Sequence, residues 1–289
     1  MTTPAPNAVD SLAHLLRERP CVVLSGAGCS TESGIPDYRG PDGSMRERQP
    51  IRFQDFMASE SARTRYWARS MIGWPRFAGS RPNAAHAALA ALEDAGFVRG
   101  VITQNVDGLH QAAGSRTVID LHGRLAEVRC MDCERVTLRD EMQRRMEELN
   151  PDFAVGAERY IADGDAELPD GSEQGFQVPS CESCGGVLKP HVVFFGENVP
   201  KDRLARTWEV FGLGALLLVV GSSLTVFSGR RFVLRAVQEQ KPVVVANLGP
   251  TRADDVAAYK LEERLGSVLP RLAEALGVAS PSRPGASPG

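Results

Sequence analysis

The stretch CVVLSGAGCSTESGIPDYRG, Cys21–Gly40, holds the pattern from which the fold can be predicted. Its first residues are apolar and β-branched, which is typical of a strand buried in a parallel sheet. The Gly-Ala-Gly turn that follows is typical of dinucleotide-binding folds, because glycine lets the backbone approach a pyrophosphate closely. A redox dinucleotide fold would continue with a third glycine and a regular helix, but Thr31 stands at that glycine position. The stretch therefore predicts a nucleotide-binding strand and turn followed by an irregular polar loop.

Similar runs along the chain predict the rest of the sheet. Four further strand candidates are Val98–Asn105, Thr117–Gly123, Leu216–Gly221 and Pro242–Asn247. Helical patterns lie between them, as at His86–Gly96 and Arg230–Gln240. Alternation of strand and helix favours an α/β fold, a Rossmann-like doubly wound parallel sheet with a smaller inserted lobe.

Two segments interrupt this alternation and are predicted to form the smaller lobe. Residues 41–81 are polar and aromatic and supply a helical segment, and residues 124–189 carry the paired cysteines and supply a zinc module. The Rossmann-like domain is then predicted to comprise residues 11–40, 82–123 and 190–279. The tail, residues 280–289, is rich in Pro, Ser and Gly and is expected to be disordered.

The composition is that of an ordinary globular protein. Of 289 residues, 43% are hydrophobic and 24% charged, and the net charge of −3 provides no basic field that would favour nucleic-acid binding. The longest apolar stretch, Ala215–Val220, is too short to span a bilayer. The N-terminus lacks a basic region and an apolar signal core. We therefore expect a cytoplasmic monomer without membrane or nucleic-acid partners.

Four of the six cysteines form two Cys-x-x-Cys pairs, CMDC and CESC. These residues are Cys130, Cys133, Cys181 and Cys184. Two such turns can direct four thiolates at one ion, the tetrahedral arrangement that zinc prefers. The alternative is two independent thiol turns or a redox pair, which is less favoured because neither pair has the strand-to-helix position of a thioredoxin-like motif. Four thiolates leave no open coordination position, so a structural zinc ion (Zn2+) is predicted.

Polar residues follow the predicted strands at the edge where parallel sheets bind ligands. Gln104, Asn105 and Asp107 come directly after one strand, and His122 follows the next. A histidine at such a position can abstract a proton near neutral pH, although a lone histidine is more often a core residue. The turn Gly221–Leu224 ends a further strand and could hold phosphate or ribose, and Asn247–Thr251 ends another strand with a side-chain amide. The remaining histidines, His14, His86, His110 and His191, are interpreted as structural.

Together these residues resemble one family, the sirtuins, which are NAD-dependent protein lysine deacylases. The matching strings are GAGCSTESGIPDYRG, TQNVDGLH, LHG, CMDC, CESC, KPHVVFFGE, GSSL and NLGPT, in the family's order from about residue 20 to about residue 270. The chain is most similar to the class II branch, through RYWARSMIGWPRF, NPDF and GPTRADD.

The resemblance implies that NAD is a co-substrate bound between a Rossmann-like domain and a zinc lobe. It assigns NAD contacts to Gly26, Ala27, Gly28, Ile35, Asp37, Tyr38, Arg39, Gln104, Asn105, Asp107, Gly221, Ser222, Ser223, Asn247, Leu248, Gly249 and Leu265. Tyr38 stands where the family usually has phenylalanine. The resemblance also implies that an acyl-lysine protein or peptide lies as an added strand beside Val192, Val193, Phe194, Phe195, Gly196 and Glu197.

In the mechanism that the resemblance implies, His122 is the general base, and Asn105 and Asp107 belong to the catalytic site. The acyl oxygen of a modified lysine attacks the anomeric carbon, and nicotinamide leaves. His122 then helps to deprotonate a ribose hydroxyl that attacks the alkylimidate, which yields lysine and O-acyl-ADP-ribose. Three alternatives are mono-ADP-ribosyl transfer on the same fold, a zinc-bearing NAD-sensing module, and, last, a hydride-transferring dehydrogenase.

Tyr66 and Arg69 resemble the Tyr-x-x-Arg pair with which desuccinylating sirtuins hold an acidic acyl chain. Three residues apart on a helix, the two side chains would share a face. Because the distance to the following RPNAAH makes the register uncertain, we favour the interpretation of the pair as a packing or solvated face.

Overall fold

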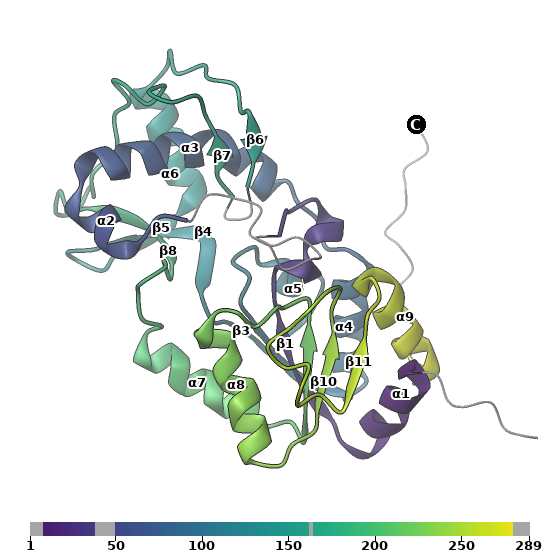
Figure 1. Ribbon diagram of the computed structural model, residues 1–289. Coiled ribbons are helices and arrows are strands. Elements are labelled where there is room, and N and C mark those ends of the chain that lie inside the picture. Colours follow the sequence, from purple (N-terminus) through teal and green to yellow (C-terminus); the bar gives the residue numbers. More distant parts are fainter. Residues whose placement is uncertain (1–7, 38–49, 162–163, 280–289) are drawn as a thin grey trace, which may run out of the picture.

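A computed structural model describes residues 8–37, 50–161 and 164–279 of the chain (Figure 1). The predicted NAD contacts Tyr38 and Arg39 and the predicted disordered tail lie outside the described residues. No described helix is both long and apolar enough to cross a membrane.

The centre of the structure is a six-stranded sheet in which every neighbouring pair is parallel, as the sequence predicted. Its strands are β1 (Cys21–Ser25), β2 (Val98–Thr103), β3 (Val118–Asp120), β9 (Leu216–Val220), β10 (Val243–Ala246) and β11 (Tyr259–Leu261). Their order is β11-β10-β9-β1-β2-β3. This is the strand order of a doubly wound Rossmann sheet, and the order reverses between β1 and β9.

Helices cover both faces of this sheet (Figure 1). One face packs against α1 (Ala8–Glu18), α4 (Ala84–Asp94) and α9 (Leu265–Ala275), and the other packs against α7 (Lys201–Gly212) and α8 (Phe227–Gln238). Since both faces are covered, all five residues of β1 are buried, which explains why its sequence does not alternate. The short helix α5 (Leu109–Ala112) follows β2.

Two helices begin earlier than the sequence patterns indicated. The helix predicted from His86 begins at Ala84, because Asn83 Oδ1 accepts from the backbone N–H of Ala85 and thereby caps it. The helix predicted from Arg230 begins at Phe227, so its first turn includes Ser228. This earlier start brings Ser228 to the site described below.

A smaller lobe is built from two insertions into the sheet domain, and in Figure 1 it lies at the upper left. Its elements are α2 (Phe53–Ala58), α3 (Glu60–Ala78), β4 (Gly123–Cys130), β5 (Val136–Leu138), α6 (Arg139–Leu149), β6 (Arg159–Tyr160), β7 (Ala166–Glu167) and β8 (Leu188–Val192). β5, β4 and β8 form an antiparallel sheet, and β6 pairs with β7. Phe56 and Trp67 of the first insertion share one core with Met142 and Leu188 of the second. The predicted boundary at residue 190 falls inside β8, because pairing with β4 continues to Val192.

Candidate active site

The site lies where the ends of β1 and β9 meet, at the reversal of strand order. Gly26 N–H donates to the Val220 carbonyl at 3.0 Å, and Gly28 N–H donates to the Gly221 carbonyl at 2.9 Å. A Cβ atom on Gly26 would lie 2.7 Å from the Gly221 oxygen, and one on Gly28 would lie 2.9 Å from Gly221 Cα. Glycine is therefore required here for the contact between two strands, in addition to any close approach to a ligand.

The loop after β1 is irregular, as its polar sequence predicted. It forms two single 3₁₀ turns, Ala27–Cys29 and Thr31–Ser33, where a redox fold would have a regular helix. Gly34 ends the second turn with φ of 84°, a left-handed conformation that favours glycine. Ile35 follows, and its buried side chain lines the cavity described below.

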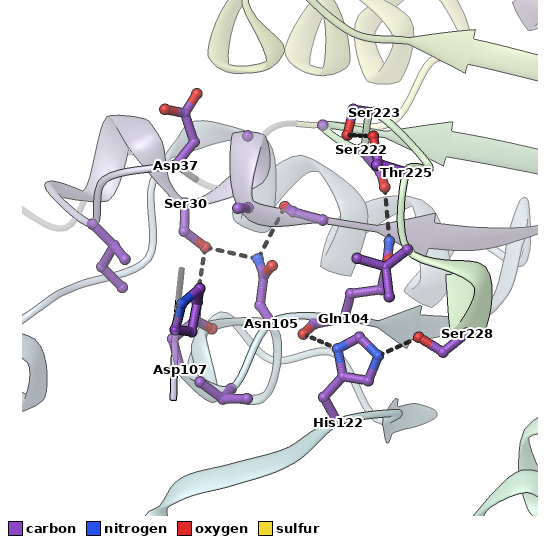
Figure 2. A pocket seen from close by; sticks show the side chains of 18 of the residues that line it. Ser30, Asp37, Gln104, Asn105, Asp107, His122, Ser222, Ser223, Thr225 and Ser228 are labelled. Atoms are coloured by element: carbon purple, nitrogen blue, oxygen red, sulfur yellow. Dashed lines mark hydrogen bonds between the residues drawn. The ribbon is translucent and has the colours of Figure 1, made fainter. Parts of the chain in front are cut away.

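Hydrogen bonds connect this loop to the residues after β2 (Figure 2). Ser30 Oγ donates to Asp107 Oδ2 at 2.6 Å, and Asn105 Nδ2 donates to the Gly26 carbonyl at 3.0 Å and to Ser30 Oγ at 3.1 Å. Burial raises the pKa of Asp107 above its ordinary value, against the effect of the Ser30 hydrogen bond. Asn105 and Asp107 are thus held in fixed positions by a loop that is distant in sequence.

His122 follows β3, and both of its ring nitrogens are hydrogen-bonded (Figure 2). Nδ1 lies 2.9 Å from the Gln104 carbonyl oxygen, which can only accept, so Nδ1 carries the proton. Nε2 then has a free electron pair and accepts from Ser228 Oγ at 2.7 Å. Burial lowers the pKa of His122 to about 4. At neutral pH the ring is therefore uncharged, with its basic nitrogen Nε2 opposite α8.

Gln104 connects the two halves of the sheet. Its side-chain Nε2 donates to Ser222 Oγ at 2.8 Å, while its carbonyl orients His122. Ser222 belongs to the turn that ends β9, so this bond joins that turn to the residue after β2. The glutamine thus connects the predicted ribose contacts with the candidate base.

These residues line a single cavity of about 1180 Å³. Among the predicted NAD contacts, its walls include Gly26, Ala27, Gly28, Ile35, Asp37, Gln104, Asn105, Asp107, Gly221, Ser222, Ser223, Asn247, Leu248 and Leu265. Gly249 is an exception, because it does not line the cavity and its N–H donates to Glu262 Oε1. Asn247 lines the cavity but bonds locally, through Nδ2, to the Leu248 carbonyl at 2.8 Å.

The predicted peptide-binding segment, Val192–Glu197, lines the same cavity. Val193 N–H donates to the His122 carbonyl at 2.8 Å, which places the segment directly beside the candidate base. Glu197 forms an ion pair with the buried Lys189 at 3.1 Å and also accepts from the Phe194 N–H. The Phe195 carbonyl accepts from the Phe53 N–H at 2.9 Å. Contacts from both lobes therefore fix the shape of this segment.

Tyr66 and Arg69 do not act as a pair in the cavity. Tyr66 is buried against Phe56 and Phe194 and lines the cavity. Arg69 is not among the lining residues, and its Nε donates to the Ala166 carbonyl at 3.0 Å. The arrangement fits the interpretation of Arg69 as a packing residue.

Two histidines that the sequence analysis interpreted as structural are buried beside Cys29. His110 Nε2 lies 2.8 Å from Ser25 Oγ, and His86 Nδ1 accepts from the Asn83 N–H in the cap of α4. Burial lowers the pKa of His86 to about 4 and that of His110 to about 3, so both are neutral. They connect α4 and α5 to the end of β1.

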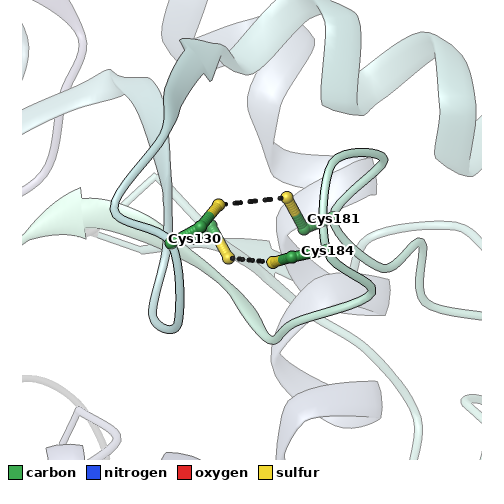
Figure 3. A group of neighbouring side chains, drawn as sticks. Cys130, Cys181 and Cys184 are labelled. Atoms are coloured by element: carbon green, nitrogen blue, oxygen red, sulfur yellow. Dashed lines mark hydrogen bonds between the residues drawn. The ribbon is translucent and has the colours of Figure 1, made fainter.

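The paired cysteines come together in the smaller lobe (Figure 3). Cys130 Sγ lies 3.5 Å from Cys184 Sγ, and Cys133 Sγ lies 3.7 Å from Cys181 Sγ. A tetrahedron of sulfurs at the usual zinc–sulfur distance has edges of about 3.8 Å. All four thiols are free of disulfides. The group therefore fits a zinc ion, and four protein ligands would leave it no open position.

Ser30, Ser228 and Arg231 belong to the site and were not predicted from the sequence. Ser30 holds Asp107 and Asn105, Ser228 bonds His122, and Arg231 lines the cavity on the same helix as Ser228. Ser30 lies inside the opening glycine-rich stretch, so its place in the motif was a usable signal. Ser228 and Arg231 gave no signal, because they reach His122 only through the packing of α8.

Comparison with known proteins agrees with this geometry. Residues 26–228 match the Sir2 family. The chain belongs to the Sir2 family. The predicted sirtuin resemblance is therefore confirmed, and the Sir2-family match includes the glycine turn, His122 and all four paired cysteines.

Curated relatives of this Sir2-family chain are named NAD-dependent protein deacetylases. One from Xanthomonas campestris pv. campestris (strain 8004) is 53% identical over 253 residues, which cover 88% of this chain and 86% of that protein. The NAD-dependent protein deacetylase 2 of Bradyrhizobium diazoefficiens is 52% identical over 266 residues, covering 92% and 97%. A solved structure of Sir2 with a p53 peptide and NAD+ has a TM-score of 0.75 and 32% identity, and the match covers 93% of this chain and 98% of that one.

Proposed function

We propose that this chain removes acyl groups from modified lysines of proteins and uses NAD as the co-substrate. The observation that carries the proposal is the position of His122 Nε2, an unprotonated nitrogen in a cavity shared by the glycine turn and the segment Val192–Glu197. The names of the relatives support the same activity, as does the solved Sir2 bound to an acetylated peptide, at a TM-score of 0.74.

In this proposal the chain's own residues position two substrates. Backbone at Gly26 and Gly28 accommodates the pyrophosphate of NAD, while Asn105 and Asp107 contact its nicotinamide end. The peptide adds as a strand beside Val192–Glu197. His122 Nε2 accepts a proton from a ribose hydroxyl, which takes the position of Ser228 Oγ as its hydrogen-bond partner.

The net reaction transfers the acyl group from the lysine nitrogen to ADP-ribose, and nicotinamide leaves. The zinc ion would be held by its four cysteines and would supply lobe structure only, since no ligand position is open. The class II assignment and the monomeric state remain predictions.

The substitution His122→Ala tests the proposal. We expect the variant to fold and to retain zinc, and to lose acyl-lysine turnover by about 10²- to 10⁴-fold, which is the usual contribution of a general base. The readouts are nicotinamide release and the masses of the products from an acetyl-lysine peptide and NAD. The matched control is His14→Ala, which removes an exposed histidine of α1 and should leave turnover unchanged.

The product masses also separate the alternatives. Free lysine with O-acyl-ADP-ribose is expected for deacylation, whereas a protein bearing ADP-ribose would identify ADP-ribosyl transfer. A wild-type chain that binds NAD without releasing nicotinamide would identify a sensing module. An unimpaired H122A rate would remove His122 from its assigned role.

A further inference from the structure

Arg231 is a cation in the cavity wall to which the proposed function assigns no partner. Among the residues that the structure describes, three arginines line the cavity: Arg52 and Arg264, which are exposed, and Arg231, which is half-buried. Within the described residues, Arg231 forms no ion pair or hydrogen bond, and its buried Nε atom has no acceptor. An arginine that lines a cavity and has no acceptor within the protein is suited to a ligand that supplies one.

Arg231 lies on the same face of α8 as the residue that contacts the candidate base. Ser228 and Arg231 lie three residues apart on α8, on one face of the helix, and Ser228 donates to His122. The backbone carbonyl of His122 in turn accepts from the Val193 N–H of the peptide-binding segment. The guanidinium lies 5.3 Å from the ring centre of Phe227, an exposed residue of the cavity wall that restrains its direction.

Three other charged residues around His122 and the peptide-binding segment already have partners. Arg203 also affects His122 electrostatically, but it does not line the cavity and contacts His191. Among the lining carboxylates, Asp107 accepts from Ser30, and Glu197 pairs with Lys189. Neither carboxylate is bonded to Arg231. The unpaired positive charge therefore remains available to a substrate.

We propose that Arg231 is a carboxylate subsite, through which the chain favours acyl-lysine substrates that carry a second, acidic group near the modified lysine. A guanidinium matches a carboxylate because its planar donors can form two parallel hydrogen bonds. The acid could be an Asp or Glu side chain of the peptide or the end of a dicarboxylic acyl chain, and the two share this chemistry. The proposal rests on the proposed function and adds a preference among its substrates.

Four peptides of one sequence separate the two sources. An acetyl-lysine peptide with Glu on either side of the lysine is compared with its Gln counterpart. In the Gln sequence, succinyl-lysine is compared with butyryl-lysine, which has the same number of acyl carbons and no charge. The four are assayed by nicotinamide release at saturating NAD with the wild type, R231Q, R231K and R230Q. Arg230 is the matched control, because it is the exposed neighbour on α8 and does not line the cavity.

We expect the wild type to prefer the acidic member of one pair by about tenfold in kcat/KM, mainly through KM, as for a charge-assisted contact. R231Q should abolish this ratio, R231K should retain part of it, and R230Q should match the wild type. The preference should also shrink at about 0.5 M salt, where the Debye length is only a few Å. The pair that shows the preference identifies the source of the carboxylate.

Other results would overturn the subsite. These are an absence of preference in both pairs, a preference that persists in R231Q, an equal loss of kcat on all four peptides, or a higher KM for NAD as the main effect of R231Q. None of these results concerns the proposed function itself, which is tested by wild-type turnover of the neutral acetyl-lysine peptide.

Discussion

Among single residues, Gly221 shows most directly how backbone shape determines the site. It has φ of +61°, and a Cβ atom at this position would lie 2.5 Å from the Cys29 nitrogen and 2.7 Å from the Gly28 carbonyl carbon. Neither neighbour is the flexible end of a side chain, so both would have to shift with the backbone. The residue thus keeps the ends of β1 and β9 in contact, next to the Gln104–Ser222 hydrogen bond.

The substitution Gly221→Ala should therefore destabilise the protein by about 1–3 kcal/mol, a usual effect of overpacking. It should also weaken NAD binding, because the displaced turns form the cavity wall. The measurements are urea unfolding and NAD titration. Gly212→Ala is the matched control, since a Cβ at this position of α7 meets no atom within 4 Å. Equal midpoints for the two variants would contradict this account of Gly221.

Much of the site could be predicted at the residue scale, and the remainder has a physical explanation. Gln104, Asn105, Asp107 and His122 were found because strand ends in a parallel sheet share one edge. Ser228 could not be found in the same way, since its contact with His122 depends on the packing of α8 against the sheet. Helical spacing placed Tyr66 and Arg69 on one face, but it could not show that Arg69 bonds the Ala166 carbonyl.

At the scale of elements, the two cysteine turns join segments of the small lobe that are distant in sequence. Cys130 ends β4, and Cys181 and Cys184 precede β8, the strand that pairs with β4. Cys130 and Cys181 are buried in the same core as Trp67 of α3. The zinc group is therefore part of the lobe's core, and β8 continues directly into the peptide-binding segment.

Loss of the zinc ligands should consequently disturb the lobe and, through β8, activity. Cys181→Ser is expected to lose the bound zinc, about one ion per chain in the wild type, and to become sensitive to proteolysis between residues 124 and 197. Metal analysis and limited proteolysis measure these effects. The buried Cys21→Val variant is the control and should keep its zinc, because Cys21 lies in β1. Full zinc content in C181S would exclude Cys181 as a ligand.

For the whole molecule, the buried His86 and His110 and the half-buried His122 couple folding to pH. His86, His110 and His122 have pKa values lowered by burial to about 4, about 3 and about 4, from an ordinary value of 6.5. Between pH 6.5 and about 4, the unfolded chain binds protons at these positions that the folded chain does not. Acidification therefore favours unfolding over this range and has little further effect through these groups below it.

We expect the free energy of unfolding to fall between pH 7 and pH 5, by at most about 1.4 kcal/mol per pH unit for each histidine. Urea unfolding at several pH values measures the slope. H122A should reduce the slope and leave the share of His86 and His110. A free energy of unfolding that does not change between pH 7 and pH 5 would contradict the neutral state of these rings in the folded chain.

The pairing of β1 with β9 also has a consequence for the order in which the protein can be made. Leu216 pairs with Cys21, although it lies 195 residues later in the chain. A ribosome that adds about 5–20 residues per second would expose the central strand about 10 to 40 seconds before its partner. The cavity wall at Gly26 and Gly221 therefore closes only after β9 has been made. A nascent chain that stops before β9 can form β1, β2 and β3, but it lacks the part of the cavity wall that residues 221–228, Arg231, Asn247 and Leu265 supply.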